Sequence, residues 1–186
     1  MHTEPSMTDP PIGGVVTGRA FRHVRSVVRL LPASDDHFAW LLGEAAAPDG
    51  LRSPEGGVDV PVVLKIVRRL TAKLHAAGCH ASWLIVDQDE VVGLCSFKRP
   101  PDDALVAEIG YGIAASRRRK GYATIGVNLL ISAVFNSRAA AQLSAETAIA
   151  NIPSQRVLAR NGFLICGART DAEDGELLIW SRSLER

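Results

Sequence analysis

A basic segment with a single glycine joins a predicted strand to a predicted helix. The segment reads Arg117, Arg118, Arg119, Lys120, Gly121, Tyr122, Ala123 and Thr124. The first backbone N–H groups of a helix are unpaired and its dipole adds positive potential there, so an anion can bind among them. Gly121 lets the backbone approach a phosphate, the basic side chains neutralise its oxygens, and the small Ala123 keeps the helix start clear. The alternative interpretation is a solvated basic turn or a weak nucleic-acid patch.

A second segment carries polar residues at fixed spacing. Its residues are Asn151, Ser154, Val157, Leu158, Gly162 and Phe163. This N-x-x-S-x-x-V-L-x-x-x-G-F pattern, together with R-x-x-G-x-A at Arg118, Gly121 and Ala123, resembles the signatures of the GNAT superfamily of N-acetyltransferases. The branch it resembles most is the one similar to ribosomal-protein N-terminal acetyltransferases. No G-x-G-x-x-G or G-K-[ST] follows the strand, so NAD and ATP are disfavoured.

The resemblance implies a cosubstrate and roles for several residues. It implies that acetyl-CoA is bound, with its pyrophosphate on residues 118–124. It also implies that Asn151 hydrogen-bonds the pantetheine arm and that Ser154 lies near the thioester sulfur. Relatives often carry a glutamate where this chain has Ile125. If the strand bulges as in relatives, the N–H groups of Ile113 and Ala114 would be the oxyanion donors.

Two carboxylates and a serine are candidates for acid–base chemistry. Acetyl transfer needs a neutral amine, and deprotonation at pH 7 costs about 1 kcal/mol for an α-amino group but about 5 kcal/mol for a lysine. Glu108 could accept this proton directly or through water, and Glu146 on the next strand competes with it; each is otherwise an exposed strand carboxylate. Ser154 is the predicted acid for the leaving thiolate, against a simple capping role. Tyr111 and Tyr122 are alternative proton donors.

The spacing of apolar residues predicts the elements that position these groups. The predicted strands are 27–31, 82–86, 91–97, 105–114, 143–149, 163–168 and 177–181, and the predicted helices are 35–42, 61–77, 121–134 and 153–160. Hairpins interleaved with helices predict an α/β (α+β) fold with a mixed sheet covered by helices on both faces. The resemblance implies that this is a single GNAT-like domain whose central sheet is mostly antiparallel. The Gly- and Pro-rich stretch 47–59 is predicted to be a flexible connection of the kind that forms functional lids.

Composition and charge limit the classes of partner. The 186 residues suit one domain, so residues 1–24 are predicted to be a flexible tail and 25–186 an acyl-CoA N-acyltransferase domain. A formal net charge of +1 gives no field that would attract nucleic acid or an anionic membrane. No apolar run approaches the ~18 residues of a membrane span. The three cysteines lack the spacing of a metal or redox motif, so reduced thiols and no metal are predicted. Residues 1–20 carry none of the apolar core of a secretory signal peptide, so a cytoplasmic location is predicted.

The leading functional prediction is transfer of acetyl from acetyl-CoA to a primary amine by direct attack in a ternary complex. The acceptor is a protein N-terminus or a small amine, and the protein is a monomer or a homodimer. The alternative is a non-catalytic acyl-CoA-binding or sensor module, which needs neither Ser154 nor a base. Four acidic residues between positions 171 and 176 either attract a cationic acceptor or solvate a hairpin tip.

Overall fold

One mixed sheet organises the protein. The computed structural model describes residues 16–19, 27–48 and 50–184, and within them the sheet has eight strands in the order β1-β2-β3-β4-β5-β6-β8-β7. Every pair of neighbours is antiparallel except β5 and β6, which are parallel. The strands are β1 (Val16–Arg19), β2 (Val27–Pro32), β3 (Ser82–Asp87), β4 (Glu90–Phe97), β5 (Val106–Ile113), β6 (Gln142–Ala148), β7 (Leu164–Asp171) and β8 (Gly175–Ser183).

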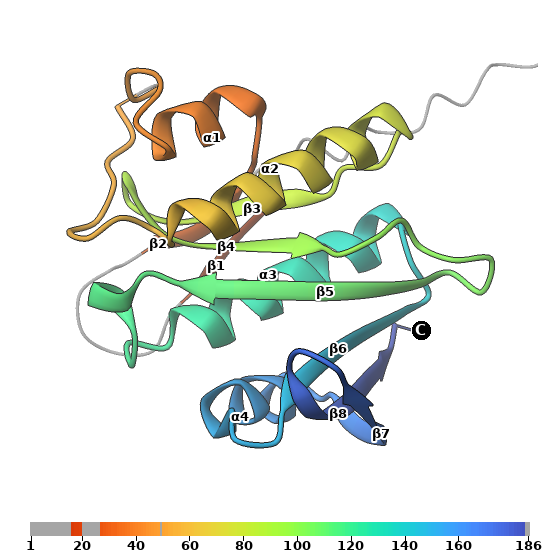
Figure 1. Ribbon diagram of the computed structural model, residues 1–186. Coiled ribbons are helices and arrows are strands. Elements are labelled where there is room, and N and C mark those ends of the chain that lie inside the picture. Colours follow the sequence, from red (N-terminus) through yellow and green to blue (C-terminus); the bar gives the residue numbers. More distant parts are fainter. Residues whose placement is uncertain (1–15, 20–26, 49, 185–186) are drawn as a thin grey trace, which may run out of the picture.

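Helices cover both faces of this sheet (Figure 1). They are α1 (Asp35–Leu41), α2 (Pro61–Ala76), the 3₁₀ turn η1 (Ala115–Arg117), α3 (Tyr122–Ser137) and α4 (Ile152–Arg160). Because side chains alternate along a strand, β3 places Leu84 and Val86 in the core under α1 and α2 and directs Ile85 to the core under α3 and α4. The predicted fold is therefore confirmed.

The ends of α1 and α2 follow local sequence signals. Ser34 caps α1 by accepting a hydrogen bond from the His37 N–H, and Pro61 occupies the first turn of α2. Gly78, with φ of +75°, ends α2, because a residue with a β-carbon is strained in that conformation. No helix among the described residues is long and apolar enough to cross a membrane.

The predicted tail and the predicted connection differ from expectation in part. Residues 16–19 of the tail form β1, and the remainder of 1–24 lies outside the described residues. In the connection 47–59, Leu51 and Val58 are buried in the core under α1 and α2. Ser116 Oγ also donates a hydrogen bond of 2.8 Å to the carbonyl of Glu55. Buried apolar side chains and a surface hydrogen bond therefore both fix this connection to the rest of the protein.

Two glycines allow elements to pack closely beside the predicted site. A β-carbon on Gly126 of α3 would lie 2.5 Å from Cδ1 of Ile85, so α3 sits directly against β3. A β-carbon on Gly93 of β4 would lie 2.4 Å from the carbonyl oxygen of Gly112 on β5. Such distances are far below normal contact, so both positions require glycine for packing rather than for backbone conformation.

Candidate functional site

The predicted phosphate-binding turn joins β5 to α3. No side chain caps α3, and Gly121 precedes it with φ of +85°. The first backbone hydrogen bond of the helix runs from the Ile125 N–H to Gly121 O at 3.1 Å, which leaves the N–H groups of residues 122–124 directed out of the helix start. Arg119 also has a positive φ, of 62°. Two such residues turn the chain sharply enough to point successive N–H groups toward one ligand.

The basic side chains of this turn divide into two groups. Arg117 forms a two-bond ion pair with Glu90, at 2.6 and 2.7 Å, and is therefore structural. Arg118, Arg119 and Lys120 are exposed, and none of them has a carboxylate partner among the residues that the structure describes. Arg118 Nε donates instead to the carbonyl of Ile113 at 3.2 Å. Three cations are thus available around the start of α3 for a polyanionic ligand.

Tyr122 has a fixed structural role in addition to its backbone N–H. Its hydroxyl donates to Asp87 Oδ2 at 2.5 Å, and burial, with Asp87 second, raises the pKa of Tyr122 to about 12. This bond ties the first turn of α3 to the end of β3. The phenol of Tyr122 is therefore engaged away from the predicted thioester position, and among the two tyrosines only Tyr111 remains a candidate proton donor.

The strands β5 and β6 separate after a short parallel pairing. Their paired residues are Val106 with Gln142, Ala107 with Leu143, and Glu108 with Ser144, and both strands continue beyond these pairs without pairing to each other. Figure 1 shows β5 and β6 diverging from this seam, with α3 behind them and α4 beside the open end. The carboxyl-terminal half of β5 therefore presents an edge inside the sheet.

Backbone geometry separates the two predicted oxyanion donors. The Ala114 N–H donates to Val92 O at 3.0 Å, and Ala114 is buried, so this N–H is engaged within the sheet. The pairing of β4 with β5 has no register shift, whereas that of β3 with β4 shifts between Ile85 and Val86. Since hydrogen-bonding direction alternates along an antiparallel strand, the neighbouring Ile113 N–H points away from β4, toward the diverged β6.

Ser154 and Tyr111 form a hydroxyl pair at the opening. Asn151 is the N-cap of α4, and its Oδ1 accepts a hydrogen bond of 3.2 Å from the Ser154 N–H. Ser154 Oγ lies 2.7 Å from the Tyr111 hydroxyl on β5. Burial raises the pKa of Tyr111, against an opposing contribution from its bond to Ser154. The phenol therefore stays protonated at neutral pH, so the pair can hold and pass on a proton.

The two carboxylates predicted as alternative bases lie on the same face of the sheet. Glu108 pairs with Ser144, and Glu146 follows Ser144 by two residues, so alternation directs both side chains to the α2 face. Glu108 is held by Lys98 at 2.9 Å and Arg99 at 3.1 Å. Glu146 is held by both arms of Arg169 at 2.7 Å, which lowers its pKa below the ordinary value. Both carboxylates are thus engaged in ion pairs.

A cavity of about 660 Å³ lies between α2 and the same face of β4 and β5. Its lining residues are Asp59, Val63, Ile66, Val67, Arg69, Leu70, Lys73, Leu94, Cys95, Ser96, Lys98, Gly110, Tyr111 and Gly112. Tyr111 is among its lining residues, so the cavity runs along the strand that carries the hydroxyl pair on its other face. Sequence reasoning missed Asp59, because only the tertiary fold brings it over Gly112.

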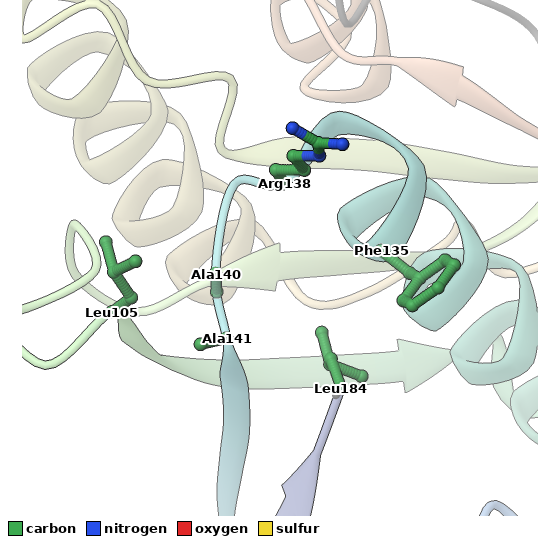
Figure 2. A pocket seen from close by; sticks show the side chains of 6 residues that line it. All are labelled: Leu105, Phe135, Arg138, Ala140, Ala141 and Leu184. Atoms are coloured by element: carbon green, nitrogen blue, oxygen red, sulfur yellow. The ribbon is translucent and has the colours of Figure 1, made fainter. Parts of the chain in front are cut away.

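A second hollow, of about 330 Å³, lies at the opposite end of α3 (Figure 2). Leu105, Phe135, Arg138, Ala140, Ala141 and Leu184 line it. At about 1.5 Å per residue, the length of α3 places it about 24 Å from the phosphate-binding turn. It is almost wholly apolar and belongs to no part of the site. Within the described residues no group of His, Cys, Asp or Glu side chains could hold a metal ion.

Comparison with known proteins gives a family match over most of the chain. The model of the acetyltransferase (GNAT) domain matches residues 28–164. Two curated relatives are the uncharacterized N-acetyltransferase YjdG of Bacillus subtilis and the ribosomal-protein-serine acetyltransferase of Escherichia coli, at 31% and 30% identity over 100 residues. These matches cover 53% and 54% of this chain, and 60% and 56% of the relatives.

The solved structures agree with this assignment at the level of the fold. A structure of RimL, a ribosomal L7/L12 α-N-protein acetyltransferase in complex with coenzyme A, matches 84% of this chain and 93% of that one. The TM-score is 0.65 at 20% sequence identity, which supports a shared fold. The predicted superfamily is confirmed by the match to residues 28–164: the chain belongs to the GNAT acetyltransferase family.

Proposed function

We propose that this protein transfers an acetyl group from acetyl-CoA to a primary amine by direct attack in a ternary complex. The observation that carries the proposal is the separation of β5 from β6 after three residue pairs. A phosphate-binding turn follows β5 at this opening, the Ser154–Tyr111 hydroxyl pair lies across it, and the cavity under α2 reaches it from the other face. A thioester and an amine can therefore meet there from opposite sides of the sheet.

The cosubstrate would be held by groups distributed along this opening. The N–H groups of residues 122–124, with Arg118, Arg119 and Lys120, suit the pyrophosphate. The Ile113 N–H suits an acceptor oxygen on the acyl or pantetheine part, as a neighbouring strand would supply. The amide nitrogen of Asn151 suits the pantetheine arm, because its Oδ1 is already occupied in capping α4.

Coenzyme A is expected to stabilise the protein, and Gly121→Val is expected to remove most of this effect. A ligand that binds only the folded state at about 100 times its Kd stabilises it by about 2.7 kcal/mol. Valine at φ of +85° is strained by about 1–3 kcal/mol, so the turn would relax and its N–H groups would lose their common direction. We expect at least about tenfold weaker binding, measured by calorimetry and by the shift in melting temperature.

Gly78→Val is the matched control for this experiment. Gly78 has a similar φ of +75°, and neither glycine has an atom within 4 Å of the position that a β-carbon would occupy. Gly78→Val should therefore lower the melting temperature by a similar amount and leave the affinity for coenzyme A unchanged. Equal affinity of wild type and a folded Gly121→Val protein would contradict the assignment of the phosphate-binding turn.

Asp59 is the carboxylate that we propose as the proton acceptor for the amine. Glu108 and Glu146 are neutralised by Lys98, Arg99 and Arg169, whereas no cation pairs with Asp59 among the described residues. Asp59 Oδ2 lies over Gly112, only 3.3 Å from where a β-carbon of that glycine would be. Its negative charge therefore faces the cavity beside the opening, where it can attract an ammonium group and take its proton.

Replacing Asp59 with asparagine is expected to lower kcat/KM at pH 7 by about tenfold. The loss should shrink as the pH rises through the pKa of the acceptor amine, because the free amine then forms without help. Glu108→Gln is the isosteric comparison and should give a loss that does not depend on pH. The reverse pattern, measured as free thiol release across pH 6–10, would return the role of base to Glu108.

A non-catalytic acyl-CoA sensor is the competing function. It predicts coenzyme A binding with no release of free thiol from acetyl-CoA in the presence of any amine class. The hydroxyl pair and the cavity that reaches it favour catalysis, since neither is needed to bind the cosubstrate. A screen of amine classes for thiol release, with product identified by mass spectrometry, separates the two functions.

A further inference from the structure

The cavity under α2 has opposite charges at its two ends and an apolar wall between them. We infer that the acceptor of this enzyme is zwitterionic: a primary amine joined through an apolar segment to an anionic group such as a carboxylate or phosphate. This inference rests on the proposed acetyl transfer and specifies its acceptor. It follows from the order in which the lining residues occur along α2 and β5.

The middle of the cavity is apolar and open. Val63, Ile66, Val67 and Leu70 line it from α2, and Ile66 remains 58% exposed although it is a large aliphatic side chain. The floor on β5 includes Gly110 and Gly112, which carry no side chain. An exposed apolar helix face above a glycine floor leaves room for an aliphatic or aromatic body, whose burial would be favourable.

The end of the cavity near the start of α2 is acidic. Asp59 precedes the helix by two residues and accepts a hydrogen bond from the Val60 N–H at 2.7 Å. Its other carboxylate oxygen lies over Gly112, the second-last residue of β5, beside the proposed thioester position. An ammonium group attracted to Asp59 would therefore arrive where the acyl group is to be transferred.

The opposite end of the cavity is basic. Arg69 and Lys73 of α2 line it with Lys98, which follows β4 and shares Glu108 with Arg99. Neither Arg69 nor Lys73 has an ion-pair partner among the described residues, while the adjacent Arg68 is saturated by Asp35 and Glu44 at 2.5 and 2.7 Å. Arg68 is therefore paired with carboxylates on the α1 side of α2, whereas Arg69 and Lys73, which line the cavity, are not paired.

One residue of the acidic hairpin at residues 171–176, Asp171, is engaged in an ion pair and in the turn itself. Asp171 Oδ1 accepts the N–H groups of Glu173 and Asp174, and its Oδ2 binds Arg169 at 2.7 Å. These bonds, Arg169 first, lower the pKa of Asp171 to about 2. The charge of Asp171 is thus paired with Arg169, while Glu173, Asp174 and Glu176 are exposed at the hairpin and do not line the cavity.

A matched pair of acceptors tests the inference directly. The compounds 4-(2-aminoethyl)benzoate and 4-(2-aminoethyl)benzamide share an amine and an apolar ring and differ only in the charge at the far end. Wild type should acetylate the benzoate with about tenfold higher kcat/KM, the effect of one charge-assisted hydrogen bond. The double variant Arg69→Gln/Lys73→Gln should lose most of that preference and treat the benzamide as wild type does.

Lys65→Gln serves as the control, because Lys65 is an exposed lysine of the same helix that does not line this cavity. The Lys65→Gln protein should retain the full preference for the benzoate.

Equal kcat/KM for the two amines in wild type, with both acetylated, would overturn the zwitterionic acceptor but would not contradict acetyl transfer. Preferential binding of the benzoate by calorimetry, lost in the double variant but without thiol release, would support the anion-binding end and contradict acetyl transfer. Absence of both binding and turnover would overturn both.

Discussion

Alanine in place of Ser154 is expected to lower the turnover of acetyl-CoA by about 100-fold while coenzyme A binding stays unchanged. Collapse of the tetrahedral intermediate expels a thiolate, which needs a proton as it leaves. Ser154 Oγ can donate that proton and recover it from the Tyr111 hydroxyl at 2.7 Å, whose raised pKa keeps it protonated. Alanine removes this donor but not the backbone of α4, so the loss should appear in kcat rather than in the KM for acetyl-CoA.

Tyr111→Phe tests whether the two hydroxyls act as one unit. On its own it should lower kcat by about tenfold, because Ser154 must then recover its proton from solvent. Added to Ser154→Ala it should cost little more, since residues that act together are non-additive. Ser132→Ala, at a half-buried serine of α3 whose hydroxyl donates to Asn128 O, is the control and should behave as wild type. Full activity of Ser154→Ala would remove the serine from the mechanism.

Alanine in place of Gly93 is expected to destabilise the protein by about 3 kcal/mol, the upper part of the usual range for overpacking. The new β-carbon would lie 2.4 Å from Gly112 O, 2.7 Å from Ile113 Cδ1 and 3.3 Å from Ile113 Cα. Two of these contacts are with backbone, so β4 and β5 would have to move apart. A glycine-to-alanine change in a strand normally stabilises the protein by about 0.5–1 kcal/mol. A loss of stability in Gly93→Ala would therefore report the steric contact with β5.

Gly110→Ala in the partner strand is the comparison for Gly93→Ala. Its nearest atoms are those of the flexible Lys98 side chain, the closest at 3.6 Å, so stability should change little. Urea unfolding of the two variants measures the difference. Gly93→Ala should also lose activity, because Gly112 and Ile113 line the cavity and the opening. Equal midpoints for both variants would show that β4 and β5 can separate without cost.

Local signals in the sequence were sufficient to predict most of the helices and strands. The apolar period from Val63 to Leu74, between Pro61 and Gly78, predicted α2 to within a residue at each end. The short β1 was missed because residues 16–19 lie in a segment rich in proline and glycine, and its pairing with β2 is a tertiary property. The turn before α3 was predicted correctly, since a strand, a basic glycine-containing turn and a helix are contiguous in the chain.

The site depended on contacts between distant segments, which local patterns do not contain. The shared face of Glu108 and Glu146 follows from the register of β5 on β6, set by residues more than thirty positions apart. The oxyanion role of Ile113 and Ala114 was conditional on a bulge, and the pairing of β4 with β5 has no register shift, whereas that of β3 with β4 shifts at Ile85 and Val86. Asp59 had no local signal at all: it ends a glycine-rich connection, and only the packing of α2 on β5 places it over Gly112.

The short pairing of β5 with β6 divides the sheet into two halves that share few backbone hydrogen bonds. One half comprises β1 to β5 and the other β6 to β8. Besides the three residue pairs they are joined by bonds from the N–H groups of Ala141 and Gln142 to Leu105 O, by a shared apolar core, and by the bond of 3.2 Å from Asn161 Nδ2 of the α4 C-cap to Thr124 O of α3. Coenzyme A held by both α3 and Asn151 would therefore bridge the two half-sheets and add to the few bonds that join them.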